Sequence, residues 1–125
     1  MENGRIKDAQ ITASSEYAGY FAIQARLNKF GGWVSTYKDA NQWIQVSLGS
    51  FTNVTGIATQ GNSATWQLVT KYLLQYGDDG VNFRYYKALC ESFPKVNYTQ
   101  VTISNCCTHS WHFRLQSSKH LNSFI

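Results

Sequence analysis

The sulfur and imidazole donors that zinc prefers occur together near the end of the chain. Cys106 and Cys107 are followed closely by His109 and His112, which gives two thiols and two ring nitrogens. Structural zinc sites usually take their ligands as two separated pairs, and adjacent cysteines reach one ion only through a sharp bend of the chain. With Cys90 the cysteine count is odd, so at least one thiol stays unpaired within the chain or pairs outside it. We therefore expect an ordinary segment here, with no bound metal.

Groups suited to acid–base or nucleophilic catalysis are sparse. The neighbouring carboxylates Asp78 and Asp79 could serve acid–base chemistry, but Asp79 precedes Gly80, and an Asp-Gly step is what a tight turn requires. All three histidines follow residue 108, so a Ser-His-acid arrangement would have to draw its base from the end of the chain. The sequence therefore predicts a protein that is not an enzyme.

Composition limits the kind of protein and its partners. The 125 residues suffice for a single domain over residues 1–125, and a 43% hydrophobic, 14% charged composition excludes a disordered chain. The net charge is +4 but basic residues form no block, so we expect weak attraction to an anionic surface and no nucleic-acid partner. No apolar run approaches the roughly 20 residues of a spanning helix, and the start of the chain lacks the apolar stretch of a signal peptide.

The elements that must position any binding residues follow a period of two. Apolar side chains alternate with polar ones over residues 43–48, which is typical of a half-buried strand. Gly49-Ser50 is then expected to turn the chain into a second strand over residues 54–59. An apolar face recurs at every other position over residues 72–76, which predicts a third strand.

A hairpin is predicted after the third strand. Gly77-Asp78-Asp79-Gly80 contains the Asp-Gly step that supplies positive φ angles to tight turns. Alternation returns over residues 100–103 and 111–115, so strands are expected to continue toward the end of the chain. Short strands, a single proline and no convincing amphipathic helix predict an all-β antiparallel sandwich or barrel. Such folds carry their recognition residues on loops at one end.

Six ordered motifs carry a resemblance to a known family. They are Ile11-Thr12-Ala13-Ser14-Ser15, Ala25-Arg26-Leu27-Asn28, Gly32-Trp33, Trp43-Ile44-Gln45-Val46-Ser47-Leu48-Gly49, Val54-Thr55-Gly56-Ile57-Ala58-Thr59-Gln60-Gly61 and Tyr76-Gly77-Asp78-Asp79-Gly80-Val81-Asn82-Phe83. In order and spacing they resemble the discoidin domain, also called the coagulation factor V/VIII type C domain. The resemblance covers residues 1–87 and implies an antiparallel, jelly-roll-like β-sandwich of galactose-binding-like type. It also implies a non-catalytic adhesion module that is extracellular or at the cell surface.

The last part of the chain departs from the family pattern. Residues 88–125 form a tail in which the closing strands of the family cannot be aligned. The final strand of the family is only weakly resembled by Phe113-Arg114-Leu115-Gln116. We therefore expect one domain made of a matched part, residues 1–87, and an unmatched tail. A tail that fails to supply the closing strands would leave sheet edges open to aggregation.

The resemblance implies that binding residues lie on three loops at one end of the sandwich. The first loop lies between Ser15 and Ala25, the second runs from Asn28 to Trp33, and the third lies between Gly61 and Tyr72. The expected contact residues are aromatic, basic or amide-bearing: Tyr17, Tyr20, Phe21, Arg26, Lys29, Trp33, Asn62, Trp66, Gln67 and Lys71. Phe21 and Trp66 are the foremost of these, and the alternative is that one or two of the aromatic rings pack into the core.

Three classes of partner fit these loops. Burying an aromatic side chain contributes about 1.5–3 kcal/mol and each basic residue near an anionic membrane about 1 kcal/mol, so binding to anionic phospholipid should be only partly reversed by salt. On a cell-surface glycan the same rings would lie flat under sugars, while the amides of Asn28, Asn62 and Gln67 hold hydroxyls. The alternative is a protein–protein interaction domain of a larger receptor or matrix protein. The sequence does not separate lipid from glycan.

Calcium and N-linked glycans are the remaining candidates for bound groups. The resemblance implies calcium near the loops in some relatives, but Asp39 is a single carboxylate where the ion takes about six or more oxygens, so no cofactor is expected. Asn53-Val54-Thr55 and Asn97-Tyr98-Thr99 fit the acceptor pattern for N-glycosylation.

Overall fold

The computed structural model describes residues 4–62, 64, 67, 69, 72–85 and 101–117, the last segment mainly by its backbone. Its elements are η1 (Asp8–Gln10), β1 (Ile11–Ala13), η2 (Ala22–Gln24), β2 (Trp43–Thr59), β3 (Tyr72–Gly77), β4 (Arg84–Tyr85) and β5 (Val101–Ser117). The strands form one antiparallel sheet in the order β1-β2-β5-β3-β4, which confirms the predicted all-β class. No helix in the described part of the chain is long and apolar enough to cross a membrane.

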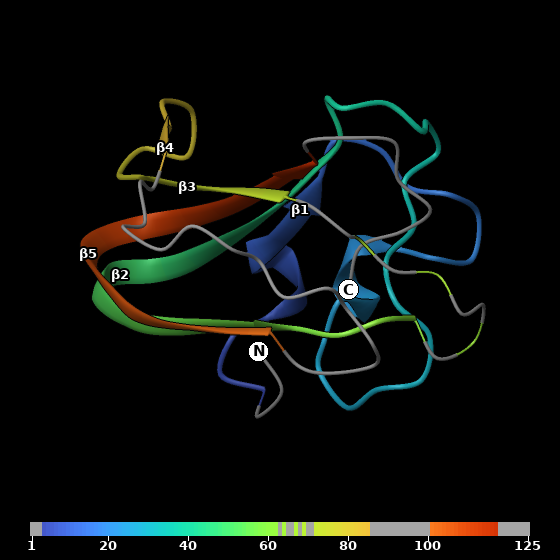
Figure 1. Ribbon diagram of the computed structural model, residues 1–125, viewed down its shortest axis with the longest axis horizontal. Coiled ribbons are helices and arrows are strands. Elements are labelled where there is room, and N and C mark those ends of the chain that lie inside the picture. The colour runs from blue at the N-terminus through green and yellow to red at the C-terminus, as the bar shows by residue number, and fades with distance from the viewer. Residues whose placement is uncertain are drawn as a thin grey trace.

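The two long strands, β2 and β5, bend together. They pair along their length, with register shifts between Ser47 and Thr52 and between Val54 and Gly56. Figure 1 shows the paired ribbon curving in its middle and returning over itself. The prediction that Gly49 and the next residue turn the chain into a separate strand is wrong. Gly49 adopts a φ of +73°, and this left-handed residue lies at an irregularity inside one continuous strand.

The returning ribbon closes the hydrophobic core. Val54 and Ile57, from the second half of β2, pack with Leu48 around the buried Leu74 of β3. A second cluster fills the space between the sheet and the loops; its buried members are Ile11, Ala22, Ala25, Trp33, Ile44, Val69 and Tyr72. Two layers of strand therefore face each other across apolar side chains, as the predicted sandwich requires.

The tail supplies the strand at the centre of the sheet. β5 lies between β2 and β3, so that Arg114 is directly opposite both Gln45 and Gln75. Residues 101–117 therefore form a strand, as the alternation over residues 100–103 and 111–115 predicts. The edges of the sheet fall to β1 and β4, which have only three and two residues and so offer little backbone for pairing with other chains.

The predicted hairpin is confirmed by the pairing of β3 with β4. Its connection, residues 78–83, is longer than a two-residue turn because the carboxylate of Asp79 organises it. Asp79 Oδ1 accepts hydrogen bonds from the backbone N–H groups of Val81 (2.8 Å) and Asn82 (2.7 Å), and Oδ2 accepts one from Asn82 Nδ2 (2.6 Å). Gly80 follows with a φ of +75°. The aspartate here is a turn residue, as the sequence indicates.

The contribution of the hairpin loop to folding stability is expected to decrease in acid. The hydrogen bonds from Asn82 and Val81 lower the pKa of Asp79 from 3.8 to about 2. Because the folded pKa lies below the unfolded one, the stabilisation is fully present above about pH 4 and is lost as the pH falls through 2. NMR titration should give a carboxyl midpoint near 2 for Asp79, and Asp79→Asn should remove the stability change in that window. Asp78→Asn is the matched control, and a midpoint near 4 for Asp79 would contradict the prediction.

Candidate functional site

The described parts of the three loops expected to bind lie at one end of the molecule (Figure 1), here called the loop pole and defined by residues 15–25, 28–33, 61, 62, 64, 67 and 69. Figure 1 shows the described connections of this region on the right, opposite the bend of β2 and β5.

The first and second loops are joined by backbone hydrogen bonds. Tyr17 N–H donates to the carbonyl of Val34 (2.8 Å), and Val34 N–H donates to the carbonyl of Tyr20 (3.2 Å). Between the two tyrosines Gly19 adopts a φ of +86°, and the rings lie 6.4 Å apart between centroids. The indole of Trp33 adds a third connection, donating from Nε1 to the carbonyl of Ser15 (2.8 Å). The two loops therefore behave as one rigid unit.

The second loop also touches the third. A Cβ placed on Gly32 would lie 3.5 Å from Cβ of Asn62, so the backbone of Gly32 packs against the side chain of Asn62. Asn28 N–H donates to Gln60 Oε1 (3.0 Å) at the end of β2, and Asn62 N–H donates to the carbonyl of Gln67 (2.8 Å). All three loops are thus tied together at their bases.

A buried amide holds the base of the first loop. Gln42 Oε1 accepts hydrogen bonds from the hydroxyls of Ser14 (2.9 Å) and Ser15 (2.6 Å), and its Nε2 donates to Asp39 Oδ1 (2.9 Å). The hydrogen bond from Gln42 is the main cause, with the N–H of Asn41 second, of the lowered pKa of Asp39. The carboxylate considered as a calcium ligand therefore accepts hydrogen bonds from Gln42 and Asn41.

Several apolar side chains in and near these loops are exposed to solvent. Phe30 is 84% exposed, between Asn28 and Gly31, which both have positive φ angles. Tyr17 and Phe21 of the first loop are also exposed, and so are Ile23 and Tyr37 beside them. Motif reasoning missed Phe30. The available signal was a large apolar residue between a lysine and two glycines in a loop, a context with nothing to bury it.

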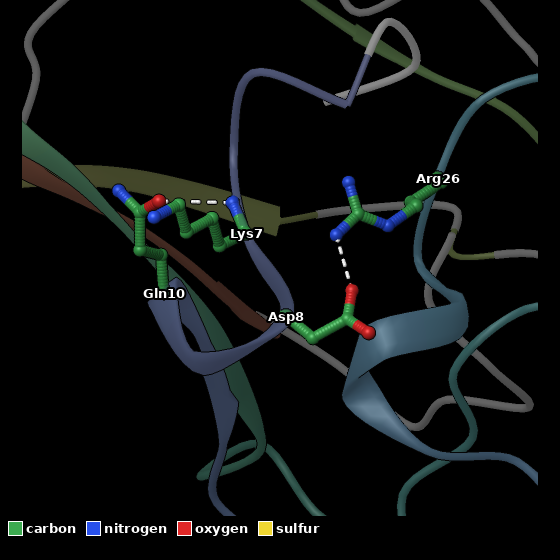
Figure 2. Close-up of polar contacts among 4 residues, drawn as sticks. All are labelled: Lys7, Asp8, Gln10 and Arg26. Carbon is green, nitrogen blue, oxygen red and sulfur yellow. Dashed lines mark hydrogen bonds and ion pairs between the residues drawn. The ribbon is translucent and has the colours of Figure 1, made fainter.

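The charge near these side chains is partly neutralised. Figure 2 shows Arg26, which follows η2, pointing toward Asp8 of the N-terminal segment, and the two form an ion pair at 2.6 Å. Gln10 in the same segment accepts from Lys7 N–H (2.9 Å) and donates to the carbonyl of Ser47 (2.8 Å), which fixes η1 against β2. Arg26 is therefore a structural cation, whereas Lys29 beside Phe30 is exposed.

Comparison with known proteins identifies the fold and the family. A family model described as the F5/8 type C domain matches residues 10–120. The chain belongs to this family. The match continues well past residue 87, where the recognised motifs end, so the F5/8 type C domain includes most of the tail.

Curated relatives of this F5/8 type C domain are longer proteins. The chain is 40% identical to retinoschisin of Mus musculus over 97 residues, which cover 70% of the chain and 43% of that protein. It is 39% identical to lactadherin of Bos taurus over 99 residues, which cover 70% of the chain and 23% of that protein. The chain therefore spans less than half the length of these relatives.

Solved structures show the same β-sandwich. CpGH89CBM32-5 from Clostridium perfringens, in complex with GalNAc-β-1,3-galactose, has a TM-score of 0.77 and 24% identity, covering 98% of this chain and 91% of that one. Discoidin II from Dictyostelium discoideum has a TM-score of 0.67 and 23% identity, covering 92% of this chain and 50% of that one. At these identities the likeness establishes the fold of the F5/8 type C domain.

Not all of the predicted contact residues reach the surface of this F5/8 type C domain. Trp33 is completely buried and Asn62 is 1% exposed, so the prediction that they touch a ligand is corrected: both pack beneath the loops. Tyr20 and Gln67 are half-buried, whereas Tyr17, Phe21 and Lys29 are exposed as predicted. Trp66 and Lys71 lie outside the described residues.

Only some of the candidate metal and glycan positions lie within the residues that the structure describes. Among the described residues no group of three or more His, Cys, Asp or Glu side chains could hold a metal ion. The side chains of Cys106, Cys107 and His109 lie outside that description, so the expectation that they bind no zinc stays a prediction. Asn53 is exposed on β2, and Asn97 lies outside the described residues.

Proposed function

We propose that this F5/8 type C domain is a non-catalytic, extracellular module that attaches to an anionic phospholipid surface through Tyr17, Phe21 and Phe30. The exposure of Phe30 carries the proposal, because a projecting apolar side chain on a rigid loop gains most by entering an apolar medium. Lys29, next to it, is placed to meet anionic headgroups.

The shape of the loop pole favours lipid over sugar. Sugar and other small-ligand sites are usually concave, with a few convergent polar groups. Here Asn62, one of the amides expected to hold sugar hydroxyls, is buried, and Phe30 projects outward. Relatives with this fold bind sugars, so sugar binding is the alternative to lipid binding in the test below.

Replacing Phe30 by serine is expected to weaken binding to vesicles that contain phosphatidylserine by about 10- to 100-fold, the cost of withholding one phenyl ring from the bilayer. Vesicle sedimentation at low and moderate salt measures this, and the wild-type protein should keep part of its binding at the higher salt. Phe51→Ser is the matched control, since Phe51 is an exposed phenylalanine at the bend of the sheet.

The sources of binding are separated by parallel experiments. The wild-type chain is applied to vesicles of phosphatidylcholine alone, to vesicles with added phosphatidylserine, and to a glycan array. Binding that needs phosphatidylserine and Phe30 supports the proposal. Binding to glycans that is insensitive to Phe30→Ser, or complete loss of vesicle binding at moderate salt, would overturn it. Binding to none of these would favour the protein–protein alternative.

A further inference from the structure

The bend of the sheet, at the end of the molecule away from the loop pole, carries an exposed aromatic ring beside an acceptor asparagine. Phe51 is 57% exposed, and Asn53 two positions later is also exposed. Thr52 and Val54 between and after them are half-buried, so exposure alternates along this part of β2. Side chains two positions apart on a strand point to the same side, and the shared exposure of Phe51 and Asn53, at the end of the register shift between Ser47 and Thr52, agrees with a common outer face.

The backbone around Asn53 leaves room for a bulky substituent. Asn53 lies between the two register shifts of β2, where the ribbon bends. In this region β2 is paired with β5 alone among the described strands, because β1 reaches only Ile44 to Val46 and β3 pairs with β5 only from His112 onward. The outer face is therefore not covered by another described strand.

We propose that Asn53 carries an N-linked glycan whose first sugar packs on the ring of Phe51. The proposal rests on the proposed extracellular location, since the modification belongs to the secretory pathway. A diphosphate-linked oligosaccharide on a lipid carrier donates the glycan. Nδ2 of Asn53 forms a bond to the anomeric carbon and loses one proton, while the bond from that carbon to phosphate oxygen breaks and the lipid diphosphate leaves with the electron pair.

Packing on Phe51 follows from the chemistry of the two faces. One face of a pyranose ring presents C–H groups with a small positive charge, and the face of a phenyl ring is negative. Stacking would remove apolar area of both rings from water, since more than half of Phe51 is exposed. A glycan here would also shield the unpaired edges of the β2–β5 ribbon from other chains and leave the loop pole free.

The first experiment tests attachment. The full chain is secreted from mammalian cells behind an added signal, and its electrophoretic mobility is compared before and after a peptide N-glycosidase. A shift that disappears in Asn53→Gln and persists in the matched variant Asn97→Gln is expected. A mobility unchanged by Asn53→Gln would overturn the proposal. The readout is independent of lipid binding, which the unglycosylated bacterial protein tests separately.

The second experiment tests packing. In the Asn97→Gln background, enzymatic removal of the glycan is expected to lower Tm by about 3 to 5 °C when Phe51 is present. In Phe51→Leu, which keeps an apolar side chain but no aromatic face, the same treatment should lower Tm by less than half as much. Equal decreases in the two proteins would refute the contact with Phe51.

Discussion

Replacing Trp33 by alanine is expected to lower the free energy of unfolding by about 3–5 kcal/mol, the usual cost of removing a large buried aromatic side chain. Trp33 is completely buried in the cluster between the sheet and the loops, and its indole N–H holds the carbonyl of Ser15. Because domains of this size are stable by only about 5–15 kcal/mol, the loss is a large share of the total. Denaturant unfolding followed by circular dichroism measures it.

Two variants separate the sources of this loss. Trp33→Phe keeps most of the apolar volume but removes the hydrogen bond to Ser15, so it should cost clearly less than alanine. Phe30→Ala changes a neighbouring aromatic residue that is exposed, and should leave stability within about 0.5 kcal/mol of the wild type. A loss under about 1 kcal/mol for Trp33→Ala would contradict the burial of this side chain.

Replacing Arg114 by alanine is expected to cost about 2–4 kcal/mol of stability. Its guanidinium lies between the rings of Trp43 and Phe83, with its central carbon 4.1 and 4.0 Å from their centroids. It also donates from Nε (3.2 Å) and Nη2 (2.7 Å) to Gln45 Oε1. Burial lowers the pKa of Arg114, because the guanidinium is partly removed from water.

The planarity of the guanidinium is what the lysine variant tests. Arg114→Lys keeps the positive charge but cannot stack on two rings and donate twice to Gln45, so it should recover less than half of the loss. Lys29→Ala removes an exposed cation and serves as the control. Full recovery of stability by lysine would show that charge alone matters, and the β3–β4 hairpin would then not depend on stacking through Phe83.

The strands were predictable because their signal is local. Alternation over residues 43–48 and 72–76 depends on neighbouring side chains only, and both segments form the strands expected. The continuity of β2 was not predictable, because a glycine with positive φ suits a turn and a bulge equally. The outcome is decided by pairing with β5, whose Arg114 donates a hydrogen bond to Gln45 of β2 across 69 positions of the sequence.

The exposure of the candidate contact residues was predictable only in part, because it too depends on residues that are distant in the sequence. Exposure of Tyr17 and Phe21 followed from their place in a loop without apolar periodicity. Trp33 has the same kind of local sequence, yet the small side chains of Ala22 and Ala25 join it in the core cluster and the Ser15 carbonyl accepts its N–H. Burial of a loop aromatic depends on such distant partners, which motif spacing does not reveal.

The central position of β5 has a consequence for how the chain acquires its structure. Any nascent chain that ends before Val101 lacks the strand that joins β2 to β3, so the described sheet cannot be complete until residues 101–117 have been synthesised. Pairing across so many positions is slow, in the range of milliseconds to seconds for β-rich domains. Until that strand is present, the edges of β2 and β3 that it joins lack this partner and are open to pairing with other chains.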